Sequence, residues 1–474
     1  MERHAVRVGA KTNSGPFVAL TTRVDGYVGR MAMITHDGDT RANVPEHRSE
    51  RREPTLAELF AELDRRARLP LRQSVTSPRH AYISEDFFEW EVEHVFREEW
   101  LCVAHVSQLP GPGQFLNLDL VGEPLSVVRD REGQVRVLSR VCPHRGMDIM
   151  PPGFGYPGFD PLDLRRGIKG HGEAGVLVCP YHNWTFGLDG RVKGCAEMHL
   201  AEGFAARDHG LAEFRSEIWQ GFVFVNLNGT ARPLGEQLAP LAAEVAPWRM
   251  AELDVVIAQS WECPFNWKVM VENWMESYHH LGIHHDTLQP MMPAKDTWTE
   301  HERPHFIRSH LPLKPALAAE LERARAGGER LPGFVEIAGL TPEQRAEWGL
   351  HLGLPCFMFL VTSDRVIWYR LEPVTAGRCR LLTTALVSKA ARAAADFEQR
   401  LDSEAQMLRG FHLQDMQVCS AVQRGLGSSA FAGGRLSHLE MPVWLIQRYI
   451  AARGRGTWPT LDQPAAPGQR EVTR

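Results

Sequence analysis

The chain has 474 residues, of which 43% are hydrophobic and 23% are charged, and its formal net charge at pH 7 is -5. This composition is typical of globular proteins, and the length suffices for two or three domains with separate cores. Acidic and basic residues are interleaved, so no basic stripe predicts nucleic-acid binding. No apolar run approaches the roughly 18–20 residues that span a bilayer. Because the N-terminus lacks a secretory signal pattern, we expect a cytoplasmic protein without membrane contacts.

The N-terminal part of the chain divides into a polar segment and a helix. Residues 1–78 are rich in arginine and polar residues, and we expect them to form a poorly ordered extension. One amphipathic patch interrupts this segment, at Leu56 to Asp64. From Glu85 to Trp100, aromatic and aliphatic residues recur at helical spacing, which predicts a helix.

After this helix the sequence changes to short β-type runs separated by turns rich in Gly, Pro and Asp. The pattern predicts an antiparallel β domain over residues 79–235. Residues 151–175 are crowded with Gly and Pro, and we expect a surface insertion there. The expected strands are Phe115–Leu120, Leu125–Arg129, Val135–Val141, Val176–Val178 and Gly221–Asn226.

Residues 236–455 mix helical and strand patterns and predict a second, α+β domain, followed by a polar tail at 456–474. Helical spacing from Asn266 to His279 precedes a poorly periodic region at 288–349. The expected strands are Cys356–Thr362, Val366–Glu372 and Arg380–Val387, and the expected helices are Arg392–Gln423 and Leu439–Ile450.

Two short segments each offer one thiolate and one imidazole: C-P-H-R-G supplies Cys142 and His144, and C-P-Y-H-N-W supplies Cys179 and His182. Two cysteines and two histidines are the ligand set of a Rieske [2Fe–2S] centre, in which histidines replace two cysteines on one iron. A structural zinc site uses the same donors. Zinc fingers usually keep like ligands together, whereas each segment here mixes Cys and His, so the pattern favours the iron–sulfur cluster.

A second cluster of possible ligands lies between Asn266 and His285. One carboxylate, Glu276, stands close to four histidines: His279, His280, His284 and His285. Two imidazoles and one carboxylate form the facial triad of non-haem Fe(II) oxygenases. On an unbroken helix His280 and His284 would share a face, whereas His279 and His284 would diverge unless the helix breaks, for example at Gly282. Local geometry therefore leaves both histidine pairs open.

These motifs, together with Q-D-M-Q-V-C-S-A-V-Q-R-G-L from Gln414, resemble the α subunits of Rieske non-haem iron ring-hydroxylating oxygenases. The resemblance runs from Glu85 to Ile450. It implies an α+β fold in which an antiparallel β Rieske [2Fe–2S] domain precedes a helix-grip catalytic domain, whose central antiparallel sheet accompanies a mononuclear iron. Two departures stand out: the spacing from His144 to Cys179 is much longer than in most members, and Asn183 stands where many have Gly.

The resemblance also assigns the catalytic residues. It implies that His279, His284 and Asp415 bind the mononuclear iron. Glu276 would accept hydrogen bonds from an iron-ligand histidine and from the cluster ligand His182 of a neighbouring subunit, bridging the two metal sites. The rival third ligands, Asp402 and Glu404, lie in a charged helical setting, and we expect them on a solvated face.

The function implied by the resemblance is that of a terminal oxygenase, which uses O2 to hydroxylate a small organic substrate. Electrons would come from NAD(P)H through a flavin reductase, with or without a ferredoxin. The reductase must be a separate chain, because no G-x-G-x-x-G fingerprint follows a strand here. The family's assembly implies a homotrimer or another α3-based oligomer.

The substrate is less well defined than the reaction class. An aromatic-ring compound is the leading expectation. Glu276 replaces the Asp common in aromatic dioxygenases and resembles members that oxidise carnitine or glycine betaine, so monooxygenation of a quaternary ammonium compound is the alternative. A non-catalytic Rieske electron carrier is a hypothesis of another class.

Four aromatic residues in adjacent expected strands are candidates for the wall of the substrate pocket: Phe357, Phe359, Trp368 and Tyr369. Their rings could stack on an aromatic substrate or surround a quaternary ammonium group. Aromatic residues in alternating strands are more often part of the core.

Overall fold

The computed structural model describes residues 52–150, 171–300, 303 and 305–457, and the elements below belong to the unit Pro54–Arg474. The predictions for residues 1–51, for 151–170 of the insertion and for the tail from 458 onward lie outside the described residues. No helix within the described ranges is long and apolar enough to cross a bilayer.

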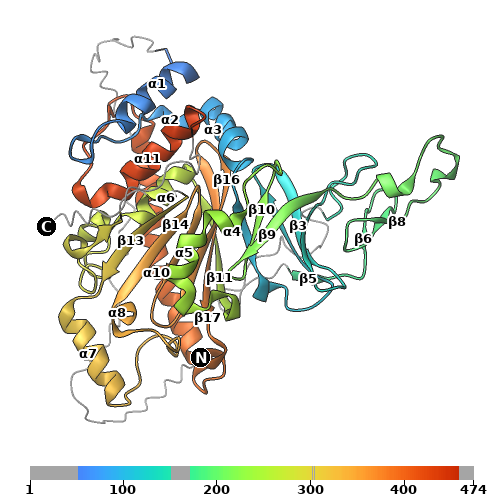
Figure 1. Cartoon of the computed structure of the whole chain (residues 1–474). Coiled ribbons are helices and arrows are strands. Elements are labelled where there is room, and N and C mark those ends of the chain that lie inside the picture. Colours follow the sequence, from blue (N-terminus) through green and yellow to red (C-terminus); the bar gives the residue numbers. More distant parts are fainter. Residues whose placement is uncertain (1–51, 151–170, 301–302, 304, 458–474) are drawn as a thin grey trace, which may run out of the picture. The chain divides into compact units, whose positions relative to one another are not determined.

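The first large antiparallel sheet has the strand order β1-β10-β9-β4-β3-β2-β5, and a small sheet of β6, β7 and β8 accompanies it (Figure 1). The five strands predicted for this region are confirmed to within two residues at each end. The strands are β1 Leu101–His105, β2 Gln114–Leu120, β3 Glu123–Arg129, β4 Val135–Ser139, β5 His171–Glu173, β6 Leu177–Val178, β7 Thr185–Phe186, β8 Val192–Gly194, β9 Glu213–Trp219 and β10 Phe222–Asn226.

The second large sheet is antiparallel throughout and has the order β11-β17-β16-β15-β14-β13-β12. Long strands rich in Val, Leu, Ile, Thr and aromatic residues favour this arrangement. The strands are β11 Asp254–Cys263, β12 Trp298–Thr299, β13 Phe306–Pro312, β14 Glu347–Gly353, β15 Phe357–Val361, β16 Val366–Thr375 and β17 Arg378–Val387.

Alternation of side chains along these strands gives the second sheet two different buried faces. Tyr369 belongs to the core on one face, whereas Phe357, Phe359 and Trp368 belong to the core on the other. On that other face, Phe222 of β10 packs against Phe357 and Trp368, with ring centroids 5.2 and 5.4 Å away. Three of the four proposed pocket aromatics are therefore core residues, and only Tyr369 lies on the face that α10 covers.

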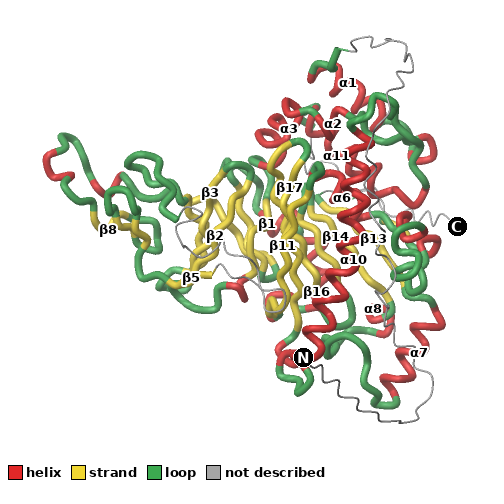
Figure 2. Tube along the Cα trace, turned by 180° about the vertical axis from the view of Figure 1, so that it is seen from behind, coloured by secondary structure: helices red, strands yellow, loops and turns green. Residues whose placement is uncertain are grey.

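Helices cover the Tyr369 face of the second sheet. Figure 2 shows α10 lying across it, with α6 beside α10 and α11 packed against α6. The α-helices are α1 Leu56–Ala67, α2 His80–Ile83, α3 Glu85–Glu91, α4 Leu234–Gln237, α5 Ala239–Val245, α6 Trp267–Met275, α7 Pro315–Ala326, α8 Pro342–Arg345, α9 Lys389–Arg392, α10 Phe397–Leu426 and α11 Met441–Gly454. A π-helical turn, Val92–Phe96, continues α3, so the helix predicted from Glu85 to Trp100 is confirmed up to Phe96 and ends four residues early.

The expectation of a poorly ordered extension is wrong for residues 54–78. Thr55 and Glu58 form a capping box, in which each side chain accepts the backbone N–H of the other residue, and this box starts α1. Leu59 and Leu63 lie one turn apart and are both buried where α1 packs on α11. The amphipathic patch in the sequence was the signal for this helix, and its apolar side becomes stable only against α11.

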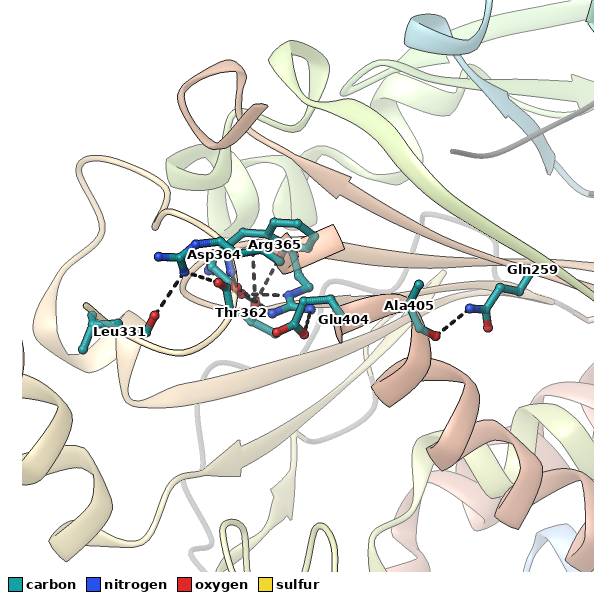
Figure 3. Close-up of polar contacts among 10 residues, drawn as sticks. Gln259, Leu331, Thr362, Asp364, Arg365, Glu404 and Ala405 are labelled. Carbon is teal, nitrogen blue, oxygen red and sulfur yellow. Dashed lines mark hydrogen bonds and ion pairs between the residues drawn. The ribbon is translucent and has the colours of Figure 1, made fainter. Parts of the chain in front are cut away.

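A buried ionic cluster attaches the first half of α10 to the second sheet (Figure 3). Arg365, in the β15–β16 turn, donates to Asp364 at 2.6 Å and to Glu404 of α10 at 2.5 Å. Asp364 also accepts the backbone N–H of Phe334 at 2.7 Å. Glu404 is only 7% exposed, so the expectation that it lies on a solvated face is wrong. Its charge is buried because the guanidinium group compensates it.

We predict that Arg365→Met lowers the free energy of unfolding by about 3–5 kcal/mol, because two buried carboxylates lose their common partner. Urea unfolding followed by tryptophan fluorescence measures this change. The matched control is Arg65→Met, which removes an exposed ion pair with Glu62 on α1 and should leave the midpoint unchanged. Equal midpoints for both variants would contradict the structural role of the cluster.

Candidate metal centres

Two loops of the first domain present the cysteines and histidines of the C-P-H and C-P-Y-H segments. Both loops close in the same way: the N–H of Gly146 donates to the carbonyl of Cys142 at 3.0 Å, and the N–H of Asn183 donates to that of Cys179 at 3.0 Å. Gly146 and Asn183 have φ values of 71° and 60°. Glycine adopts this left-handed conformation freely and asparagine tolerates it, which explains why Asn can stand at the second position.

The four donor side chains of these loops converge. Cys142 and Cys179 are buried, and burial together with the neighbouring Cys179 thiol raises the pKa of Cys142. The rings of His144 and His182 lie 4.7 Å apart, and the Trp184 ring stacks on His144 at 4.9 Å. Paired thiols beside paired imidazoles suit the donor set of a Rieske [2Fe–2S] cluster.

The histidines of the second cluster follow α6 and do not lie on it. The Asn266 side chain caps the start of α6 by accepting the N–H of Lys268 at 2.9 Å. The helix ends at Met275, and Glu276 is extended with φ -104° and ψ 149°. A separate 3₁₀ turn, Tyr278–Leu281, follows. The expectation that the helix continues to His279 and breaks at Gly282 is thus corrected, since the break falls at Glu276.

This break brings His279 and His284 together, with ring centroids 5.1 Å apart. The alternative candidate, His280, turns away, and its Nδ1 lies 3.2 Å from the carbonyl oxygen of Met292. Burial lowers the pKa of His280 to about 3, so it is a neutral core residue. The structure therefore pairs His279 with His284, a choice that local geometry left open.

Asp415 of α10 completes a group of three possible ligands. Its carboxylate and the imidazoles of His279 and His284 offer ligand atoms that all lie within 4.8 Å of one another. Asp415 Oδ1 is 3.1 Å from His284 Nε2 and 3.9 Å from His279 Nε2. Two imidazoles and one carboxylate on one side of a site are the donor set of a facial-triad iron centre.

Neighbouring side chains fix the orientation of the His279 and His284 rings, so that the Nε2 atom of each ring points toward Asp415. Glu276 Oε1 lies 2.7 Å from His279 Nδ1, and Gln414 Oε1 lies 2.8 Å from His284 Nδ1. Burial opposes a charge on His279, but the carboxylates of Glu276 and Asp415 outweigh it and raise its pKa. Burial also opposes the charge of Asp415, yet the adjacent imidazoles hold its pKa below the usual value.

Two residues of this site are not assigned a role by any sequence motif. Gln414 fixes the His284 ring, and Asn273 of α6 donates its amide to Asp415 Oδ1 at 3.1 Å. Gln414 directly precedes Asp415, and Asn273 stands three positions before Glu276. Proximity in sequence to these two residues was therefore the available signal. Neither amide belongs to a ligand type, and only the folded contacts reveal its role.

A group of rings lies beside the three ligands. Trp274 of α6 contacts Tyr369 of β16 at 3.9 Å between centroids, and Tyr369 lies 4.8 Å from His412 of α10. Trp261 of β11 lies 5.1 Å from His412. His412 precedes Asp415 by one helical turn, so both side chains are on the same face of α10.

Comparison with known families accounts for both parts of the chain. Residues 99–204 match the Rieske [2Fe-2S] domain, and residues 250–455 match the catalytic domain of the ring hydroxylating alpha subunit. The two matched regions contain every proposed ligand of the cluster and of the mononuclear iron.

Individual relatives include enzymes with two kinds of substrate. The glycine betaine monooxygenase oxygenase subunit of Pseudomonas aeruginosa is 25% identical over 391 residues, which is 77% of this chain and 85% of that protein. A structure of a quaternary ammonium Rieske monooxygenase that oxidises carnitine has a TM-score of 0.66 and 24% identity, covering 85% of this chain and 99% of that one. Naphthalene 1,2-dioxygenase from Rhodococcus sp. has a TM-score of 0.63 and 18% identity, with coverages of 81% and 95%.

We predict that Asp415→Ala abolishes binding of the mononuclear iron and spares the iron–sulfur cluster, because the two donor sets are separate. Metal analysis, acid-labile sulfide and visible absorption measure both centres. His182→Ala should have the opposite effect and remove the cluster spectrum.

Asp402→Ala is the control for Asp415→Ala, since Asp402 is the rival acid on the same helix and should be dispensable for iron. An Asp415→Ala protein that keeps its full complement of iron would show that the third ligand is another residue.

Proposed function

Because the chain belongs to the α subunits of Rieske ring-hydroxylating oxygenases, we propose that it is the terminal oxygenase of a quaternary ammonium monooxygenase. Its substrate carries an N-methylated cationic group, and its electrons come from NAD(P)H through a separate flavin reductase, with or without a ferredoxin. The aromatic-ring substrate expected from the sequence has weaker support, because the naphthalene dioxygenase likeness concerns the fold alone.

The observation that carries this proposal is the pair of rings beside Asp415. Trp274 and Tyr369 meet on the covered face of the sheet, and Asn273 next to Trp274 donates to Asp415. Faces of Trp and Tyr attract quaternary ammonium groups through the negative potential of the ring. The similarity to the glycine betaine enzyme over 391 residues agrees with this chemistry.

Two groups of residues would hold the cofactors. Cys142, His144, Cys179 and His182 would bind the [2Fe–2S] cluster, and His279, His284 and Asp415 would bind the mononuclear Fe(II). When bound, the cluster supplies electrons one at a time and the iron supplies O2 activation. The donor types fit both groups, as described above for the thiol–imidazole and imidazole–carboxylate sets.

Glu276 is proposed to connect the two centres across a subunit boundary. Its Oε1 accepts from Nδ1 of His279 at 2.7 Å, which holds that ring with Nε2 toward Asp415. Figures 1 and 2 draw β6 and β8 on the opposite side of the large sheets from α6. A homotrimer or another α3-based assembly would bring His182 of a neighbouring subunit to Glu276.

We predict O2 uptake, with NAD(P)H and a generic reductase, on addition of glycine betaine or carnitine. Mass spectrometry should detect an amine and an aldehyde as products, because hydroxylation beside the nitrogen gives an unstable product that splits. Benzoate and naphthalene are the comparison substrates. Ring diols from these compounds, without amine from the ammonium compounds, would favour the aromatic alternative.

We predict that Glu276→Gln lowers turnover at least about tenfold, because the amide keeps the shape of the carboxylate but lacks its charge for orienting the two histidines. Visible absorption and iron content should stay at the wild-type level, which separates this effect from metal loss. Glu262→Gln is the control, since Glu262 is an exposed carboxylate paired with Arg380. Wild-type turnover in Glu276→Gln would exclude the proposed connection.

A further inference from the structure

The loop that presents the first pair of proposed cluster ligands, Cys142 and His144, is closed at its base by the backbone. The N–H of Cys142 donates to the carbonyl of Met147 at 2.8 Å. Further out, the N–H of Ile149 donates to the carbonyl of Arg140 at 2.8 Å. The loop is therefore a narrow antiparallel hairpin, and Arg140 stands at its base, two positions before Cys142.

The side chain of Arg140 is buried at this base. It is only 1% exposed, and its Nη2 donates to Asp148 Oδ2 at 3.1 Å and to Asp119 Oδ1 at 2.6 Å. Asp148 lies on the returning side of the hairpin, and Asp119 lies on β2 of the first large sheet. The other oxygen of Asp148 accepts the backbone N–H of Met150 at 2.9 Å. The guanidinium thus ties both sides of the hairpin to the sheet. We call Arg140, Asp119 and Asp148 the loop-base ion group.

The loop-base ion group adjoins the core that contains the cluster thiols. Ile149 and Met150, which directly follow Asp148, pack in one buried core with Cys142 and Cys179. Charges at the edge of such a core interact more strongly than charges in water, because the surrounding medium is less polar and holds few ions. A fixed charge at the base of the hairpin therefore changes the energy of any charge that is added within this core.

The two carboxylates of the group differ in their contact with water. The side chain of Asp148 is 23% exposed and that of Asp119 is 36% exposed. Asp119 also lines an open cleft of about 530 Å³, together with Glu372 of β16 and Arg380 of β17 in the second domain. Water and ions in the cleft screen Asp119, so its charge should act on the core more weakly than the charge of Asp148.

We propose that Arg140 is a positioning residue for the [2Fe–2S] cluster and that its buried charge raises the reduction potential of the cluster. Reduction adds one electron, so a nearby cation stabilises the reduced form and a nearby carboxylate destabilises it. The inference rests on the proposed function, because it takes Cys142 and Cys179 as cluster ligands. It goes further by assigning the residue that sets how readily a reductase can load the cluster.

The signs of the shifts distinguish this role from a merely structural one. A structural role loosens the hairpin whichever member of the ion group is replaced, so the potential would shift in one direction for all of them. A charge effect gives opposite signs, because Arg140→Gln removes a cation whereas Asp148→Asn and Asp119→Asn each remove an anion. All three substitutions keep a polar side chain at the position.

The test measures the reduction potential in the holoprotein by anaerobic titration against redox dyes, with the visible absorption and the EPR signal of the cluster as readouts. At a fixed potential, Arg140→Gln should shift the ratio of oxidised to reduced cluster about tenfold toward the oxidised form, which lowers the potential by about 59 mV. Asp148→Asn should raise the potential. Asp119→Asn should raise it less, because its carboxylate faces the open cleft.

The matched control is Arg136→Gln. Arg136 lies on β4 of the same domain and also pairs with two carboxylates, Asp130 at 2.8 Å and Glu213 at 2.9 Å. It stands further from Cys142 along the chain and is partly exposed, so this variant should keep the wild-type potential. Arg140→Lys keeps the charge but lacks the planar fork, so its potential should lie between those of the wild type and Arg140→Gln.

The outcomes separate this inference from the proposed function, because the titration needs no substrate. A wild-type potential in Arg140→Gln, or shifts of the same sign in Arg140→Gln and Asp148→Asn, would overturn the inference. If Arg140→Gln does not fold, the two aspartate variants decide, and a potential raised in neither of them would overturn it. Shifts of opposite sign in a protein that does not turn over glycine betaine or carnitine would support the role of Arg140 and count against the proposed substrate.

Discussion

The candidate iron centre depends on the point at which α6 ends. If the helix continued through Glu276, its hydrogen-bonding pattern would place His280 with His284 and would direct His279 elsewhere. The extended backbone at Glu276 instead restarts the chain as a 3₁₀ turn, and His279 then faces His284 and Asp415. The same change of direction lets the Glu276 carboxylate reach back to His279 Nδ1. One backbone break thus sets both the ligand pair and the residue proposed to connect the centres.

Both helices that carry this site are held by buried charges. On α6, Lys268 Nζ lies 2.6 Å from Glu91 Oε1, and Trp267 donates to the same carboxylate at 3.0 Å. On α10, Arg365 joins Glu404 to the turn of the second sheet. Such pairs are directional, and breaking one leaves an uncompensated charge in a medium of low dielectric constant. They therefore fix the positions of the helices more narrowly than apolar packing alone.

The two faces of the second sheet pack against different parts of the protein. One face packs Phe357, Phe359 and Trp368 against the first domain, which forms a continuous aromatic core. The other face carries Tyr369 and Thr383 toward α10, and Thr383 Oγ1 lies 2.6 Å from Nε2 of His412 on that helix. Neighbouring aromatic residues in one strand thus differ in role because successive side chains point to opposite faces.

The sequence by itself determined the ligand types, most strands and the family. The cluster ligands could be identified because a Cys and a His stand two or three positions apart in each loop, so their closeness does not depend on the fold. It also contained the signals for α1 and for the acid at Asp415. Local spacing left the histidine pair open and the resemblance implied His279 with His284; the tertiary structure brings these two rings together with Asp415, which meets His284 across 131 positions of the chain. It alone showed that Glu404 is buried. Burial and hydrogen-bond satisfaction depend on every element packed around a group, and no local pattern encodes that environment.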